Sequence, residues 1–193
     1  MTLPVHHTDQ GWIVAYTGRW VESTLRPFPG ESWLTVDEAR QRYESELGVF
    51  ETVEASTSNG TELTAPRWVF GATRREMIRT QFFNQALSII ASITYTGHDG
   101  QLFLNQRSDY EYPDAQTRYT RSNATQIVSS YYKTDGTGYF DVRDNTTRQT
   151  QSTAFKDADF SSLWFDWPAF GDWDVFANPE NGILPRDFPM TPL

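Results

Sequence analysis

The chain has 193 residues, a length typical of one domain, and its 25 acidic and 16 basic residues give a formal net charge of −9. Nucleic acids and anionic lipid surfaces are bound largely through Lys and Arg, so this balance argues against both as partners. The sequence contains no cysteine, which excludes disulfides, thiolate catalysis and cysteine-ligated metals.

The first elements expected along the chain are a strand and a short helix. Residues 11–20 are rich in β-branched and aromatic side chains and are bounded by glycines, which predicts a strand. After a proline-rich loop, Thr35 and Glu38 have the spacing of a capping box. Apolar residues then recur at helical spacing, and Gly48 is a stop signal. We therefore predict a helix over residues 35–48.

Two strands are predicted next, over residues 48–56 and 62–72, joined by the polar turn TSNGT. Pro66 lies within the second of them and lacks the N–H that a sheet ladder requires. We therefore expect that strand to be at an edge or to be interrupted near the proline.

A second helix is predicted over residues 74–91, where Thr73 and Glu76 repeat the capping signature. Apolar residues recur at helical spacing, with arginine and asparagine on the opposite side. The apolar stripe consists of Ile78, Phe82, Ala86, Ile89 and Ile90, widened by Phe83 and Leu87. Such a helix would be roughly 27 Å long, enough to cross a sheet, and we expect it at the centre of the fold.

The pattern that follows is one strand after another. Residues 92–107 predict a hairpin that turns at residues 97–100, and residues 124–144 predict a second hairpin that turns at Asp135-Gly136. Strands that cluster in this way, without alternating with helices, argue against a doubly wound parallel sheet.

Residues 145–153 are polar at nearly every position, so neither side of a strand there belongs in an apolar core. We expect a solvated edge strand. The alternative is the wall of a small-ligand cavity, lined by Arg148, Thr150 and Ser152.

Together these elements predict an α+β fold in a single domain spanning residues 1–193. A curved antiparallel β-sheet would pack on one long central helix, with the shorter N-terminal helix at its side. The proline-rich tail from about residue 177 is expected to be irregular and to lie over the surface.

No metal-binding, phosphate-binding or nucleophile-elbow motif occurs, so we expect no catalytic residue, no metal and no cofactor. Carboxylates next to aromatic rings leave a carbohydrate-binding protein, or a glycoside-active enzyme with an Asp/Glu pair, as the alternative function. The carboxylates considered for such a pair are Asp109, Glu111, Asp166, Asp172 and Asp174.

Between Leu163 and Phe176 the chain has six aromatic rings, three aspartates and no basic residue. Pro168 and Gly171 interrupt both helical and strand periodicity, so we expect an irregular segment that wraps over the domain. Its rings either seal the core or stay partly accessible, because the aspartates must remain solvated or paired.

Residues 156–193 contain seven acidic and two basic residues, a net −5 of the −9 of the whole chain. Aromatic side chains surrounded by one sign of charge are typical of protein interfaces. The predicted partner-binding residues are Trp164, Asp166, Trp167, Asp172, Trp173 and Asp174, with Tyr110 and Tyr112 as outliers.

No basic leader followed by an apolar run is seen, and no stretch approaches about 18 uninterrupted apolar residues, so a cytoplasmic location is expected. We therefore predict a non-catalytic binding protein, most concretely a bacterial immunity-type inhibitor of a basic toxin or enzyme. The alternatives are the ligand- or carbohydrate-binding protein described above and a component of a phage or structural assembly.

Overall fold

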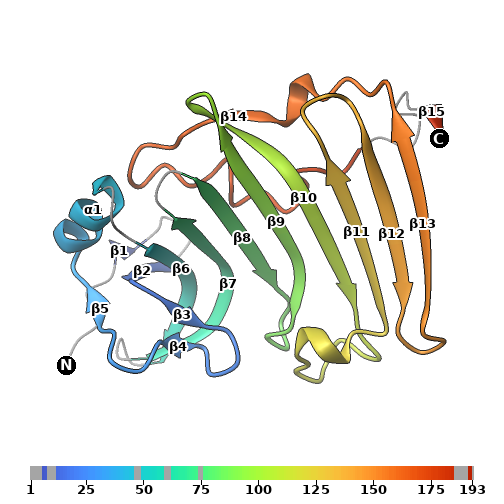
Figure 1. The fold of residues 1–193 in the computed structure, drawn as a ribbon. Helices are drawn as coiled ribbons and strands as arrows, with labels where there is room; N and C mark the ends of the chain where they lie inside the picture. The colour runs from blue at the N-terminus through green and yellow to red at the C-terminus, as the bar shows by residue number, and fades with distance from the viewer. Residues whose placement is uncertain are drawn as a thin grey trace.

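The computed structural model describes residues 6–7, 12–45, 49–58, 62–73, 76–184 and 191–192. Within these residues the dominant feature is one antiparallel sheet of 13 strands (Figure 1). Strands β6 to β13 follow one another across the sheet in chain order, so most of the fold is a meander. A second, two-stranded sheet is formed by β3 and β4.

The strands are β1 (His6–His7), β2 (Ile13–Thr17), β3 (Trp20–Val21), β4 (Arg26–Pro27), β5 (Trp33–Leu34), β6 (Val49–Ser58), β7 (Glu62–Thr73), β8 (Met77–Phe83), β9 (Ile89–His98), β10 (Gln101–Glu111), β11 (Gln126–Tyr132), β12 (Gly138–Asp144), β13 (Gln149–Lys156), β14 (Trp164–Asp166) and β15 (Thr191–Pro192). The helical elements are α1 (Val36–Glu44) and the single 3₁₀ turns η1 (Arg121–Asn123) and η2 (Ser161–Leu163). The order across the large sheet is β1-β2-β6-β7-β8-β9-β10-β11-β12-β13-β15, with β5 beside β2 and β14 beside β10.

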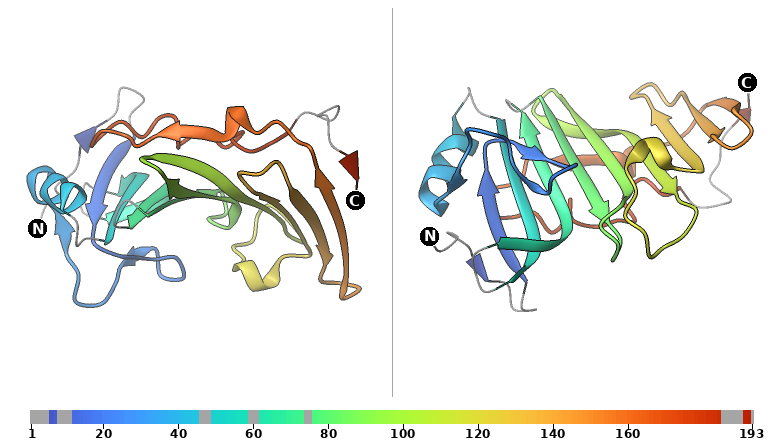
Figure 2. Two further views of the ribbon diagram at one scale, coloured as in Figure 1. Left: turned by 45° about the horizontal axis from the view of Figure 1, so that its top comes forward. Right: turned by 90° about the horizontal axis from the view of Figure 1, so that it is seen from below.

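The two faces of the sheet are covered by different parts of the chain (Figure 2). Residues 160–184, here called the strap, run along one face, which we call the strap face. The β3–β4 hairpin and the loop that contains η1 lie on the opposite side, the hairpin face. Side chains of β7 alternate accordingly, since Trp68 and Phe70 join the core under the strap and Val69 joins the smaller cluster under the hairpin.

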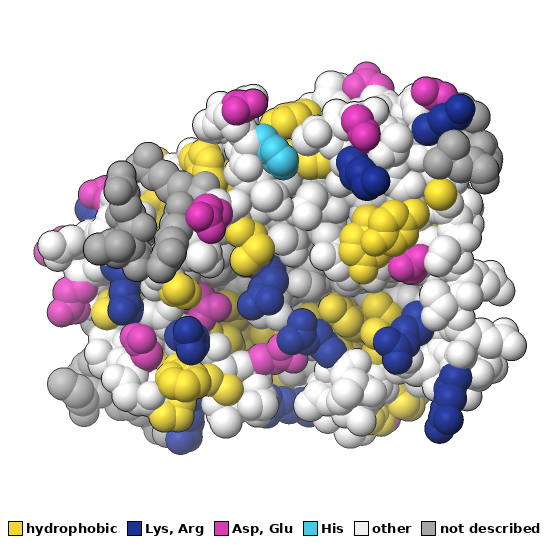
Figure 3. Space-filling view, viewed as in Figure 1, with side chains coloured by type: hydrophobic (Ala, Val, Ile, Leu, Met, Phe, Trp, Pro, Cys, Tyr) yellow, Lys and Arg dark blue, Asp and Glu magenta, His cyan; other side chains and the backbone are white. Residues whose placement is uncertain are grey.

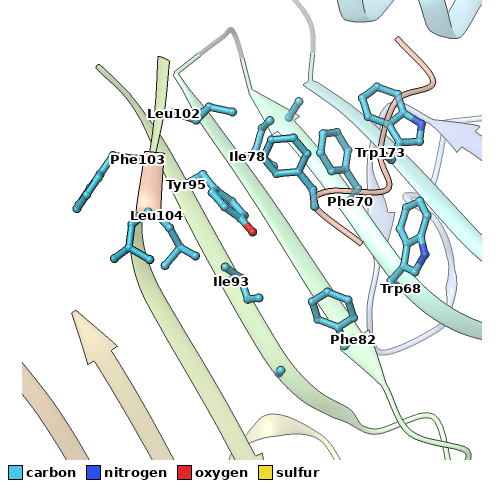
Figure 4. Packing of buried hydrophobic residues seen from close by; sticks show 14 of the residues in the cluster. Trp68, Phe70, Ile78, Phe82, Ile93, Tyr95, Leu102, Phe103, Leu104 and Trp173 are labelled. Atoms are coloured by element: carbon cyan, nitrogen blue, oxygen red, sulfur yellow. The ribbon is translucent and has the colours of Figure 1, made fainter. Parts of the chain in front are cut away.

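The main core lies between the sheet and the strap (Figure 4). Its sheet side is built from fully buried side chains on neighbouring strands, among them Phe70, Ile78 and Tyr95. The strap contributes Trp173, which is 4% exposed and whose ring centroid lies 4.5 Å from that of Phe70. The C-terminal aromatic run is therefore part of the hydrophobic core.

The predicted long helix over residues 74–91 is wrong, and with it the α+β class. In this segment, residues 77–83 form β8 and residues 89–98 form β9, paired antiparallel to each other. Ile78, Thr80 and Phe82 are all buried on one side of β8, an alternation that the helical pattern had concealed. The segment carries apolar side chains on both faces of the sheet, with Phe82 in the main core and Phe83 and Ile89 in the smaller cluster, so its apolar residues also fit a helical period.

The turn between β8 and β9 replaces the middle of the predicted helix. The backbone N–H of Ser88 donates to Asn84 Oδ1 at 2.9 Å, and Leu87 has a φ of 66°. At the other end, the backbone N–H of Glu76 donates to the Thr73 carbonyl at 2.8 Å, so this pair closes the β7–β8 turn instead of capping a helix. Asparagine offers local hydrogen bonds that favour turns over helix interiors.

The shorter predicted helix is present as α1, which begins with the expected capping box. The backbone N–H of Glu38 donates to the Thr35 hydroxyl, and the Thr35 N–H donates to the Glu38 carboxylate at 2.8 Å. The helix ends at Glu44, earlier than predicted, and Gly48 lies outside the described residues. Its buried Ala39 packs in the main core.

The prediction for Pro66 is confirmed in both of its forms. The pairing of β6 with β7 shifts register between Glu54 and Ala55, beside the proline, so the ladder is interrupted there. Strand β8 pairs only with residues 68–73 of β7, so Pro66 lies where no third strand needs its missing N–H.

Both predicted hairpins are confirmed, as β9–β10 with its turn at Asp99-Gly100 and β11–β12 with its turn near Asp135-Gly136. The polar segment forms β13, which pairs with β12 along its length and with β15 only at Phe155 and Lys156. The expected solvated edge strand is therefore present.

Candidate functional site

The strap is tied to the sheet by hydrogen bonds from buried polar side chains. Arg107 has a side chain that is 6% exposed, and its Nη1 donates to the carbonyl of Asn181 at 2.8 Å and to that of Pro179 at 2.5 Å. Tyr132 donates its hydroxyl proton to the Gly182 carbonyl at 2.8 Å. Asn181 Nδ2 in turn donates to the hydroxyl of Tyr95 at 2.9 Å. These contacts hold the strap in one position.

The strap also enters the sheet directly as β14. Its residues pair with residues 101–103 of β10, while β11 pairs with residues 106–111 of the same strand. Trp164 lies opposite Phe103, with the ring centroids 5.0 Å apart, and is half-buried. On either side of β14 the strap has exposed residues, such as Ser162 and Ala169, although Leu163 is buried.

The predicted partner-binding residues of the strap divide into two groups. Trp173 is enclosed in the core, whereas Trp164 and Trp167 are only partly buried. The three aspartates are all exposed. They are Asp166, Asp172 and Asp174. Asp166 accepts a hydrogen bond of 3.2 Å from Gln101 Nε2, and within the described chain none of the three forms an ion pair.

A cavity of about 610 Å³ opens beside Trp167. The strap forms one wall with residues 167–169, the β9–β10 turn forms the other with residues 97–100, and Tyr43 of α1 completes the lining. Tyr43 donates its hydroxyl proton to the carbonyl of Pro168 at 2.8 Å, which joins α1 to the strap. The exposed Asp99 contributes a carboxylate to this lining.

Tyr110 and Tyr112 lie away from the strap residues. Tyr110 is at the other end of β10 from β14 and packs on the hydrophobic cluster of the hairpin face. Tyr112 stacks on Tyr119 with centroids 5.6 Å apart and donates to the Ile89 carbonyl at 2.7 Å. Burial raises the pKa of Tyr112 to about 12, with the neighbouring Tyr110 and Glu22 acting in the same direction. Both tyrosines have structural contacts, and the structure does not bring them together with the strap.

The carboxylates considered for sugar chemistry lie in different surroundings. Asp109 binds Arg107 through both of its oxygens, at 2.8 and 2.5 Å, and its side chain is 41% exposed. Glu111 is exposed at the end of β10. A paired acid and base must be held at a set separation around one substrate bond, and none of these carboxylates lines the cavity beside Trp167.

The alternative ligand cavity along the polar strand is likewise not formed by its three proposed residues. Arg148, Thr150 and Ser152 are exposed at the edge of the sheet. Ser152 donates to Asp141 Oδ1 of the adjacent strand at 2.5 Å. These side chains face solvent along β13 and its turn.

No sequence pattern predicts a site on the hairpin face, where arginines from separate segments line a hollow. One of them, Arg79, was assigned to the polar side of the wrongly predicted helix. The alternation of Arg79 and Gln81 with the β-branched and aromatic residues 78, 80 and 82 is the signal that would have placed Arg79 on a sheet face.

Comparisons with protein-family models, with curated proteins and with solved structures found no match for this chain. In the described ranges, no cluster of three or more His, Asp or Glu side chains is arranged to hold a metal ion. The same ranges contain no helix with the length and apolar character needed to span a membrane.

Proposed function

We propose that this protein is a non-catalytic binding protein that uses the outer side of the strap to hold a basic protein partner. Its most concrete form is a stoichiometric inhibitor of a basic toxin or enzyme, as immunity proteins are. The observation that carries the proposal is the cavity beside Trp167, which lies next to exposed carboxylates without ion-pair partners in the described chain.

The strap is suited to this role because side chains on its inner side fix it to the sheet. Trp173 and Phe176 are buried in the core, so the exposed aspartates between and before them lie on an ordered backbone. Rigid binding surfaces lose less conformational entropy on association than mobile ones. Aromatic side chains that are partly exposed at such a surface are the usual anchors of protein interfaces.

The cavity indicates how a partner would engage. Its walls include Trp167, Pro168 and Tyr43, which offer apolar and aromatic surface, and its rim carries Asp99. A lysine or arginine side chain fits this combination, because its stem packs on apolar surface while its cationic end meets a carboxylate. Asp166 and Asp172 extend the negative charge along the strap and would steer a basic partner toward it.

The proposal is tested with the immobilised protein, by capturing partners from a lysate of the source organism and measuring the affinity of the captured protein. Two variants report on the strap. Trp167→Ala removes the aromatic wall of the cavity, and Asp172→Lys reverses one charge. Each should weaken binding by roughly tenfold or more, as expected for an anchor residue and for a charge opposed to its partner.

The matched control is Glu111→Lys, which makes the same charge reversal at an exposed position at the far end of β10. It should leave the affinity within about twofold of the wild type. Capture that is equal for Asp172→Lys and the wild type would contradict the proposal. So would turnover of an oligosaccharide that is lost when Asp166 or Asp172 is replaced, because the strap would then be catalytic.

A further inference from the structure

The hairpin face contains a second hollow, which the strap does not reach. The β3–β4 hairpin and the loop with η1 both lie on this face (Figure 2, left), and they line the hollow together with residues of β6 and β8. They are joined to each other, since Arg118 Nη2 donates to the carbonyls of Glu22 and Ser23 at 3.0 and 2.9 Å. Arg121 forms an ion pair of 3.0 Å with Glu22. Hairpin and loop therefore make a fixed wall instead of two independent loops.

Two adjoining cavities lie between this wall and the sheet. The larger has a volume of about 500 Å³ and the smaller about 260 Å³. Both are lined by Trp20, Glu51 and Arg79, which marks the place where they meet. The volume of the larger one falls within the usual range for small-molecule sites.

The floor of the two cavities is formed by a row of three residues across neighbouring strands. Glu51 of β6 pairs with Gly71 of β7, and Gly71 pairs with Arg79 of β8. A Cβ atom at Gly71 would lie 3.3 Å from the Glu51 carboxylate, so the absence of a side chain there leaves open the space between the acid and the arginine. The carboxylate and the guanidinium do not form an ion pair across that space.

Glu51 is instead held by the wall. Its carboxylate accepts a short hydrogen bond from the backbone N–H of Trp20. Burial raises the pKa of Glu51, while the Trp20 N–H and the guanidinium groups of Arg79 and Arg19 act in the opposite direction.

Two polar groups of the floor lack protein partners in the described ranges. Arg79 is exposed to the hollow and forms neither a hydrogen bond nor an ion pair there. Gln81, two residues further along the same side of β8, is only 5% exposed, lines the larger cavity and has no side-chain hydrogen bond. The Gln81 amide therefore lines the cavity with its donor and acceptor groups available to a ligand.

The charge around the hollow has the opposite sign to that of the whole protein. Four arginines line the two cavities, Arg19, Arg79, Arg118 and Arg121, against the two acids Glu22 and Glu51. Lys and Arg side chains are visible around the central hollow of this face in Figure 3. A positive site in a chain with a net charge of −9 attracts anions selectively.

The remaining lining combines hydroxyl side chains, such as Ser23, Thr120 and Ser122, with apolar ones. Trp20 is 7% exposed and stacks near Trp33, with the ring centroids 6.0 Å apart, and Val21 and Leu87 line the larger cavity beside it. A site that combines free arginine with aromatic and aliphatic surface suits a molecule with a charged head and an apolar body.

We propose that this hollow binds a small organic anion, whose carboxylate, sulfonate or phosphate head is held by Arg79 and Gln81 and whose apolar body packs on Trp20, Val21 and Leu87. The Glu51 carboxylate lies next to the head and limits the affinity by repulsion. This site is separate from the strap and does not depend on the proposed partner.

The test uses two fluorescent probes that differ only in the anionic group. 8-Anilinonaphthalene-1-sulfonate (ANS) carries a sulfonate on an aromatic body, and N-phenyl-1-naphthylamine is the same body without it. Titration of the folded protein at low salt should show binding of ANS at one site, and the neutral probe should bind about tenfold more weakly or worse. Charge-assisted hydrogen bonds to an anion account for a difference of this size.

Three variants test which residues determine the ANS affinity. Arg79→Gln should weaken ANS binding by roughly tenfold, because it removes the unpaired charge at the head. Glu51→Gln should strengthen ANS binding about threefold or more, because it removes the repulsion while the amide oxygen still accepts from Trp20. Lys133→Gln, which removes a charge at the exposed β11–β12 turn, should change nothing.

Circular dichroism and a denaturation curve establish that each variant is folded before it is titrated. The opposite signs expected for Arg79→Gln and Glu51→Gln distinguish a specific site from general loss of structure, which would weaken both. Equal ANS affinity in Arg79→Gln and wild type, equal affinity for the two probes, absence of ANS binding, or weaker binding in Glu51→Gln would each overturn the proposal.

Discussion

Arg107 joins the two parts of the molecule that lie far apart in sequence, the meander and the strap. Its guanidinium binds the Asp109 carboxylate on its own strand and two carbonyls of the strap, at Pro179 and Asn181. Since a buried guanidinium needs all of these partners, the residue and the strap stabilise each other. The charge of Arg107 thus holds the strap in place, whereas Arg79 forms no ion pair within the described residues.

Replacing Arg107 by glutamine should destabilise the protein by about 2–4 kcal/mol, because the strap carbonyls lose charged donors in a nearly dry environment. The free energy of unfolding from denaturant titration measures this effect, and limited proteolysis should show faster cleavage near residues 177–184. Arg143→Gln, at an exposed position on β12, is the matched control and should stay within about 0.5 kcal/mol of the wild type. An Arg107→Gln protein as stable and as resistant as the control would show that the strap is held by its rings alone.

Among the elements, the β-hairpins of the meander are the ones that the local sequence predicts best. Their turns contain glycine or a residue with a left-handed backbone, such as Asp99 with a φ of 48° and Gly136 with a φ of 79°. The β8–β9 turn contains Asn84 and Leu87 but no glycine, and the sequence pattern there predicts a helix. Turn chemistry, more than hydrophobic periodicity, therefore decided which strands could be recognised.

The β12–β13 turn offers a direct test of this backbone effect. Arg148 ends the turn with a φ of 59°, a conformation that costs a residue with a Cβ about 1 kcal/mol, and its side chain is exposed. Arg148→Gly should therefore raise the free energy of unfolding by about 0.5–1 kcal/mol in a denaturant titration. Gln149→Gly, one residue further in the extended strand, should lower it by a similar amount. A loss of stability in Arg148→Gly would mean that its side chain makes a contact of its own in solution.

For the whole molecule, the aromatic strap has two roles that alternate along its length. Trp173 and Phe176 point into the core, with Trp173 against Phe70, Phe50 and Tyr43, while Trp167 lines a surface cavity. The two expectations for this segment, sealing the core and remaining partly accessible, thus apply to different residues of it. A single sheet needs a second layer to bury its apolar face, and the strap supplies that layer.

This division predicts different costs for two tryptophans six residues apart. Trp173→Ala should destabilise the protein by about 3–5 kcal/mol, because it leaves a large cavity in the core. Trp167→Ala should cost less, about 1–2 kcal/mol, because this ring is only partly buried and lines a surface cavity. The midpoints and slopes of denaturant unfolding curves give both values. Similar losses for the two variants would contradict the assignment of Trp167 to the surface.

Local features of the sequence were enough for the capping box of α1, the turns of two hairpins, the interruption at Pro66 and the polar edge strand. Each depends on residues within a few positions of one another, where backbone conformation and hydrogen bonding are settled by neighbours in the chain. The interruptions at Pro168 and Gly171 also indicated correctly that the C-terminal run wraps over the domain.

Tertiary structure alone decided the state of residues 74–91 and the position of both candidate sites. The apolar residues of β8 and β9 satisfy helical and strand periodicity alike, and the choice is made by backbone hydrogen bonds among β7, β8 and β9. The row of Glu51, Gly71 and Arg79 likewise exists only because three strands pair in one register. Long-range pairing of this kind leaves no short-range pattern, since the residues it joins are separated by the whole length of a strand and its turn.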